Sequence, residues 1–136
     1  MANAAIRNDV QETVENSNRP MPDRSIDLVF LAQQSLGDRD LEVELLTLFE
    51  KQAETIAARL VKPVCSGDRK WQHDLAHTLK GSARAVGASR VAVSAEEFEA
   101  ALAAGVSAET LAEYAGRLDH EVAAARKVIL DLIAGQ

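Results

Sequence analysis

The chain has 136 residues, of which 47% are hydrophobic but only 4% aromatic, and its net charge is −6. This length favours one domain, and an apolar fraction dominated by Ala, Leu and Val favours closely packed helices over a β-rich fold. The acidic balance argues against nucleic acid or an anionic membrane as the main partner. No apolar run approaches the ~20 residues of a membrane span, and the lone Cys65 cannot form an internal disulfide, so we expect a cytoplasmic protein.

Residues 1–22 are polar and end in Pro-Met-Pro. We therefore expect a disordered N-terminal arm, followed by one helical domain over residues 23–136. This domain should open with a short helix, which Asp23 or Ser25 would cap and which would end at Gly37. The apolar side of this helix would consist of Ile26, Val29, Phe30 and Leu31.

Four longer helices follow, each indicated by apolar residues at helical spacing. We expect them over about residues 38–62, from 66–68 to 86, over 88–104, and from Ser107 onward, with Pro63, Gly87 and Gly105 ending the first three. The predicted core stripes are Leu41, Leu45, Leu48, Phe49, Gln52, Ile56 and Leu60; then Leu75, Leu79, Ser82 and Val86; then Val91, Ala95, Phe98 and Leu102; and then Leu111, Ala115, Leu118, Val122, Ala125, Ile129 and Leu132. Such helices with short connections predict an all-α fold, an antiparallel four-helix bundle with a short additional N-terminal helix as a lid.

One helix carries an unusual polar face, in the stretch WQHDLAHTLKGSARAVG from Trp71 to Gly87. At about 100° per residue, its predicted core stripe is centred near 50° from Trp71, and His77 falls near 240°. The residues that share the face of His77 are Lys70, His73, Lys80, Gly81 and Arg84. An acidic protein is thus predicted to gather a small basic patch around one exposed histidine.

This patch suits phosphoryl transfer. Imidazole has a pKa near 6.5, so much of it is an uncharged nucleophile at neutral pH. Lys80, at i+3 from His77, can reach a phosphoryl group on the ring and neutralise its charge. Gly81, at i+4, costs about 1 kcal/mol inside a helix, which a site that must admit another protein's backbone would tolerate. His73 and Arg84 are possible supporting residues.

The motif His77-Thr78-Leu79-Lys80-Gly81-Ser82-Ala83, followed by Val86-Gly87, resembles the signature of histidine-containing phosphotransfer (HPt) domains of bacterial phosphorelays. The stretches from Leu36 to Leu41 and from Glu44 to Phe49 resemble the second helix of that family, and the likeness covers about residues 25–134.

The resemblance implies a monomer in which His77 accepts a phosphoryl group from the phospho-aspartate of one receiver domain and passes it to another. It also implies response-regulator receivers or a hybrid histidine kinase as partners, with Lys80 beside the phosphate and Gly81 as the clearance glycine. We expect no intrinsic cofactor, and Mg²⁺ would come from the receiver. No ATP-binding glycine loop is present, so His77 should not autophosphorylate.

Other interpretations remain open. An isolated exposed histidine is usually only solvated, and a helical adaptor without chemistry is the main rival function. His73 and His77 also have the i, i+4 spacing of zinc ligands, but a third protein ligand is missing, so we expect no metal site. Glu96, Glu97 and Glu99 are predicted to form a solvated helix face. Val43 and Leu46 stray from the core stripe of their helix, and we expect them to contribute to docking.

Overall fold

The computed structural model describes residues 24–62 and 69–135, and every regular element in these two ranges is an α-helix. The elements are α1 (Leu28–Ser35), α2 (Arg39–Leu60), α3 (Lys70–Val86), α4 (Ser89–Ala104) and α5 (Ala108–Ala134). The predicted all-α fold is therefore confirmed. Within these ranges, no helix combines the length and the apolar character that crossing a membrane requires. The predicted N-terminal arm, Cys65, Pro63 and the predicted helix start at 66–68 lie outside the described residues.

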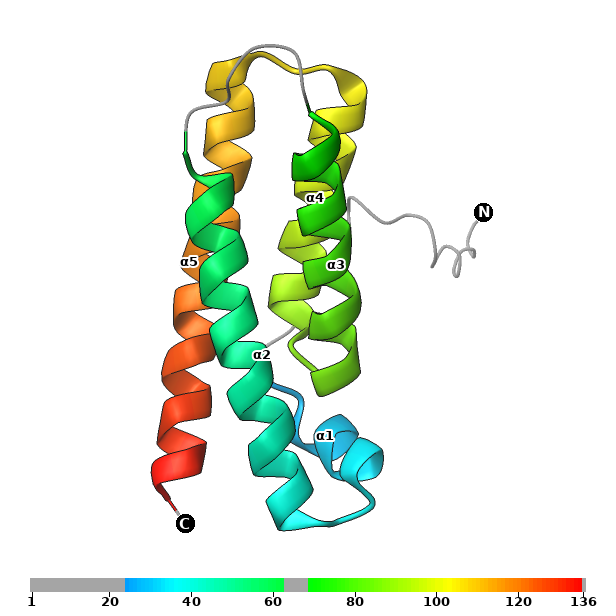
Figure 1. Cartoon of the computed structure of the whole chain (residues 1–136), viewed down its shortest axis with the longest axis vertical. Coiled ribbons are helices and arrows are strands. Elements are labelled where there is room, and N and C mark those ends of the chain that lie inside the picture. Colours follow the sequence, from blue (N-terminus) through cyan, green and yellow to red (C-terminus); the bar gives the residue numbers. More distant parts are fainter. Residues whose placement is uncertain (1–23, 63–68, 136) are drawn as a thin grey trace, which may run out of the picture.

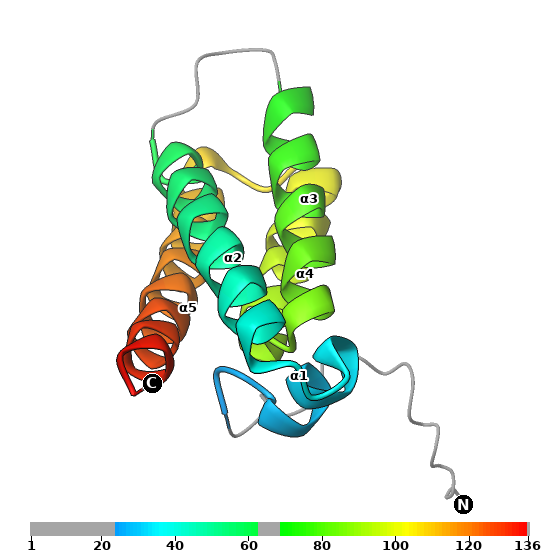
Figure 2. The same ribbon diagram turned by 60° about the horizontal axis from the view of Figure 1, so that its bottom comes forward.

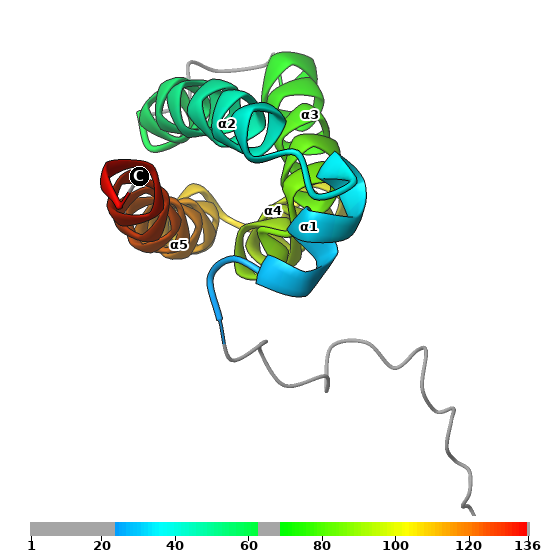
Figure 3. The ribbon, with the colours of Figure 1, turned by 90° about the horizontal axis from the view of Figure 1, so that it is seen from below.

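The four long helices run side by side along the long axis of the molecule (Figure 1). Seen from one end, they occupy the corners of a square, with α3 between α2 and α4, and α5 closing the ring against α2 (Figure 3). The short helix α1 packs across one end of the bundle, against α2 and α3 (Figure 2). This is the predicted four-helix bundle with an additional N-terminal helix.

Local signals in the sequence define most helix ends. The Asp38 carboxylate accepts a hydrogen bond from the Leu41 N–H at 3.2 Å and caps α2, and the Ser107 hydroxyl accepts one from the Thr110 N–H at 3.1 Å and caps α5. Side chains that accept from these otherwise unpaired N–H groups stabilise helix starts. Gly87 and Gly105 take the left-handed conformation after α3 and α4, as predicted, although α4 begins at Ser89 rather than Ala88.

The start of α1 differs from the prediction. Its N-cap is Asp27, whose carboxylate accepts from the Phe30 N–H at 3.0 Å; Ser25 does not cap it, and Asp23 is outside the described residues. The Asp27 backbone N–H also donates to the Gly87 carbonyl at 2.8 Å. A Cβ on Gly87 would lie only 2.9 Å from the Asp27 carbonyl oxygen. The close approach that this glycine permits places α1 beside the C-terminal end of α3.

The end of α1 also differs, because the helix ends at Ser35 and Leu36 already takes the left-handed conformation, which the predicted end residue Gly37 takes as well. Leu36 has a φ of 56°, and 91% of its surface is exposed. A left-handed backbone costs an L-residue roughly 1–2 kcal/mol. Val29, predicted to be in the core, is exposed as well, whereas Ile26 and Leu31 are buried.

The core stripe of α2 is rotated from the predicted one. Leu48 and Leu41 are exposed, whereas Leu46 is completely buried. The stripes predicted for α4 and α5 are buried as expected from Val91 to Leu102 and from Leu111 to Ile129. The buried residues of α2 are Leu46, Phe49, Glu50, Ala53, Ile56, Ala57 and Leu60.

Ion pairs near the surface of the core tie α5 to both of its neighbours. Arg126 of α5 pairs with Glu50 of α2 at 2.6 Å, and Arg90 of α4 pairs with Glu121 of α5 at 2.9 Å. Both carboxylates are nearly buried, and a buried charge is tolerated only when it is paired. These two ion pairs join α5 to α2 and α4. Neither of them includes a residue of α3, the helix that carries His77.

Candidate functional site

His77 lies near the middle of α3, and 64% of its side chain is exposed. The buried residues of α3 are Gln72, Ala76, Leu79, Ala83 and Val86. Their directions average about 100° from Trp71 at the ideal helical angle, so the buried face is centred about 50° from the predicted one. His77 is still about 140° away from that centre, which is why it faces solvent. The sequence-based placement of His77 on the outside of the helix is therefore confirmed.

Glu99 of α4 is the residue that organises this face. Its carboxylate oxygen Oε2 lies 3.1 Å from Nδ1 of His77 and 3.4 Å from Nε2 of His73. Its other oxygen, Oε1, lies 2.8 Å from Nζ of Lys80. The side chain of Glu99 is only 12% exposed. The prediction that Glu99 belongs to a solvated helix face is therefore wrong, because it faces α3 and contacts three basic side chains.

The register of the α3–α4 hairpin explains this meeting. His77 lies 11 residues before Ala88, and Glu99 lies 11 residues after it. Because a tight turn joins two antiparallel helices there, residues at equal distance from the turn lie at the same height along the bundle. The signal was therefore present in the sequence once Gly87 was identified as the helix end.

The electrostatics of Glu99 reflect these contacts. Burial raises the pKa of its carboxyl group, but the contacts with the Lys80 ammonium and the His77 ring outweigh burial, so the pKa lies below its ordinary value of 4.5. Glu99 is consequently ionised at neutral pH and can only accept hydrogen bonds. The Nδ1 atom of His77 is then the donor in the 3.1 Å contact, and in the neutral ring this leaves Nε2 with the lone pair.

The basic patch predicted around His77 is in fact a mixed patch. Lys80 is only 17% exposed and is held by Glu99. Lys70 pairs with Asp74 at 3.0 Å, and the contacts of Asp74 with Lys70 and His73 lower the pKa of its carboxyl group.

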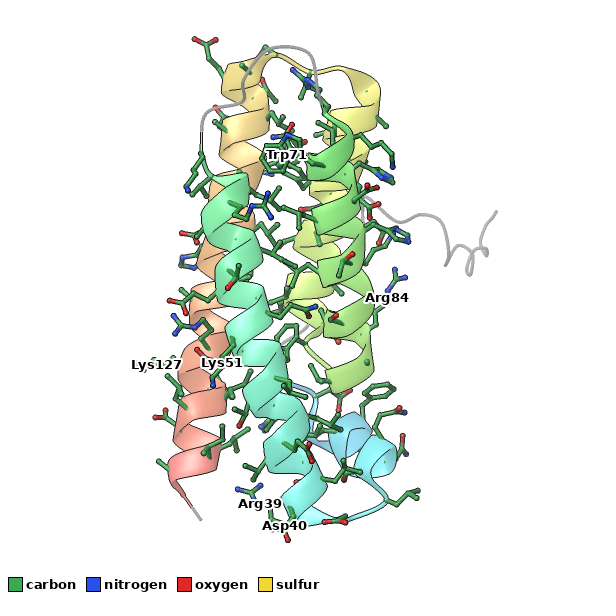
Figure 4. All side chains as sticks on the ribbon, viewed as in Figure 1. Arg39, Asp40, Lys51, Trp71, Arg84 and Lys127 are labelled. Carbon is green, nitrogen blue, oxygen red and sulfur yellow. The ribbon has the colours of Figure 1, made fainter. Side chains whose placement is uncertain are left out.

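Arg84 projects outward from α3 on the side away from α2 (Figure 4), where its Nη2 atom is 3.5 Å from a Glu96 oxygen. The structure therefore places a carboxylate beside each of these basic side chains.

Gly81 lies one helical turn beyond His77 and is exposed. A Cβ built on it would meet no atom within 4 Å other than its own helix backbone and chain neighbours. No packing contact within the described residues therefore requires a glycine here, although it costs about 1 kcal/mol relative to alanine.

The two histidines of the site lie one above the other. The rings of His73 and His77 are stacked, with centroids 5.8 Å apart and planes inclined by 10°. Within the part of the chain that the structure describes, no group of three or more His, Cys, Asp and Glu side chains is arranged to hold a metal ion. The structure thus adds nothing in favour of the alternative zinc site.

The residues predicted to contribute to docking differ in their exposure. Val43 is half-buried, and Leu46 is completely buried in the core. The prediction that Leu46 forms part of a docking surface is therefore wrong, since a partner cannot reach it. The exposed apolar side chains of this region are Leu28, Val29, Leu36, Leu41 and Leu48.

Comparison with known proteins gives one result. A family model described as Hpt domain matches residues 44–128, which is more than half of the chain. No curated protein and no solved structure matches the chain.

Proposed function

Because the chain belongs to the Hpt domain family, whose members carry phosphoryl groups on a histidine in phosphorelays, we propose that His77 is the histidine that carries the group. The observation that carries this proposal is the contact between Nδ1 of His77 and the ionised Glu99 carboxylate at 3.1 Å. It leaves an exposed imidazole with its Nε2 lone pair available to solvent and to a partner.

The chemical step follows from this tautomer. The Nε2 lone pair attacks the phosphorus of an aspartyl phosphate on a receiver domain. The Nε2–P bond forms while the P–O bond to the aspartate breaks, and the aspartate carboxylate leaves with the electron pair. Nδ1 keeps its proton, so the phosphorylated ring is a cation whose charge the Glu99 carboxylate balances. Transfer to a second receiver reverses these steps, with the incoming aspartate as nucleophile.

Lys80 and Gly81 support the step from the next turn of α3. The Lys80 ammonium, held 2.8 Å from Glu99, lies at i+3 from His77 and can face the phosphoryl oxygens. Gly81, which has open space around it, lets the receiver approach close enough for in-line transfer. The receiver would supply Mg²⁺ to its own phospho-aspartate, so the HPt-like chain needs no cofactor of its own.

The partners we propose are receiver domains of response regulators and hybrid histidine kinases, which would bind a monomer of this chain over the exposed side of α3. Helix α1 lies beside Gly87, at the C-terminal end of α3. At 1.5 Å per residue, Gly87 is about 15 Å from His77 along the axis of α3. That distance fits within an interface of ordinary size. Val29 and Leu36, both strongly exposed, are the apolar contacts we propose there, in place of Leu46.

The test is transfer from a receiver domain charged with labelled acetyl phosphate, followed by assay of the chain for an acid-labile, base-stable label. We expect the label in the wild-type chain and in the variant His120→Gln, a surface control on α5. We expect none in His77→Gln. Undiminished label in His77→Gln would refute the proposal and favour an adaptor whose function needs no histidine chemistry.

A further inference from the structure

His73 has carboxylates at both of its ring nitrogens. Its Nδ1 atom lies 3.4 Å from an Asp74 oxygen, and its Nε2 atom lies 3.4 Å from Oε2 of Glu99. The contact at Nδ1 is a long hydrogen bond, whereas the contact at Nε2 is at ion-pair distance only. A positive charge on the His73 ring would thus be attracted by both carboxylates, while His77 shares Glu99 through Nδ1 alone.

The stacking of the two rings brings the charge of His73 close to the reacting group. The centroids are 5.8 Å apart, and both side chains are more than half exposed. A phosphoryl group on His77 would add about two negative charges within reach of the His73 ring. Because histidine changes its charge near neutral pH, the attraction would be present in mild acid and absent in mild base.

We propose that His73 is a proton-dependent positioning residue for the phosphorylated site, which rests on the proposed role of His77. In its protonated form, held between Asp74 and Glu99, His73 stabilises the phosphoryl group on the neighbouring ring. In its neutral form it does not. The balance between phospho-His77 and a receiver's phospho-aspartate consequently depends on whether His73 is protonated.

The other charged groups that face this site come from α3 and α4. They are Lys70, which pairs with Asp74; Lys80, which pairs with Glu99 of α4; and Arg84, which pairs with Glu96 of α4. Within the described residues, no ion pair joins His73 to α1, α2 or α5. Of these side-chain types, only histidine ordinarily changes its charge near neutral pH.

The size of the effect follows from Coulomb's law. One charge about 6 Å from another in water changes a proton affinity about threefold, or about half a pH unit. Partial burial strengthens the interaction and salt screens it, so the titration is measured at low ionic strength.

The experiment is a ³¹P NMR titration of the full chain between about pH 5.5 and 8.5, after chemical phosphorylation with phosphoramidate. In that reaction the Nε2–P bond forms, the P–N bond of phosphoramidate breaks, and ammonia leaves. The variants are His73→Gln, which removes the charge, and His73→Lys, which makes it permanent. His120→Gln is the control for a surface histidine away from the site.

We expect the phosphoryl group of His73→Lys to titrate about half a pH unit below that of His73→Gln. The wild type should follow the lysine variant at the acid end and the glutamine variant at the alkaline end, and His120→Gln should match the wild type. Coincident curves for all four proteins would overturn the role of His73. The proposed function fails instead if His77→Gln accepts label from a charged receiver as well as the wild type does, so the two failures are distinguishable.

Discussion

Replacing Gly81 with alanine should make the protein more stable and less active. The added methyl group meets no atom within 4 Å outside its own helix, so it causes no clash. Alanine is favoured over glycine in a helix interior by about 0.8–1.0 kcal/mol. For a domain of this size, we expect the melting temperature to rise by about 3–4 °C.

Phosphoryl transfer should change in the opposite direction. The methyl group would lie on the exposed face one turn from His77, where the receiver must approach. A misplacement of about 1 Å in a transfer reaction can cost about a hundredfold in rate, so we expect at least a tenfold loss. Rapid-quench measurement of label transfer from a charged receiver gives the rate, and thermal unfolding followed by circular dichroism gives the stability.

Gly116 provides a matched control, because it also lies exposed inside a helix, α5, with nothing within 4 Å of a Cβ. Gly116→Ala should gain the same stability and transfer at the wild-type rate. If Gly81→Ala transferred as fast as the wild type, Gly81 would not serve as clearance for a partner. If it lowered the melting temperature, the helix around Gly81 would contain a strain that the geometry does not reveal.

Three further predictions concern the same surface. Glu99→Gln should slow transfer at neutral pH, since a neutral amide no longer balances the charge on the phosphorylated ring. Burial raises the pKa of Glu99, but its contacts with Lys80 and His77 outweigh burial and lower the pKa below 4.5, so the stability that the ionised carboxylate contributes is present above pH 4.5 and lost as the pH falls further. The free energy of unfolding measured in urea should therefore depend less on pH in that range for the variant than for the wild type. Lys80→Ala should slow transfer, with helicity unchanged by circular dichroism; a matching loss of helicity would mean that Lys80 acts mainly in packing against Glu99. Leu36→Gly should keep or raise thermal stability, because glycine accepts the left-handed backbone, while weakening receiver binding in calorimetry; unchanged affinity would exclude Leu36 from the interface.

Much of the fold is readable from the sequence, because local interactions decide it. Asp38 and Ser107 cap helices through their own side chains, and Gly87 ends α3 because it accepts a positive φ. The exposure of His77 is predictable in the same way, from its angle relative to the apolar residues of its own helix. These features depend on residues a few positions apart, so they need no knowledge of how the helices pack.

The tertiary structure decided which apolar residues are inside and which charges meet. Leu46 is buried and Leu48 exposed because α2 packs against both α3 and α5. Part of the buried face of α2 consists of alanines, which contribute little to a hydrophobic pattern, so the pattern alone did not predict that face. The direction of a helix's buried face is thus set by its neighbours. Glu99 is the clearest case: its distance from the turn gives its height beside His77, but only the packing of α4 against α3 turns its carboxylate toward His77, His73 and Lys80. The sequence by itself determines the exposed histidine, and the packing of two helices determines the charges that surround it.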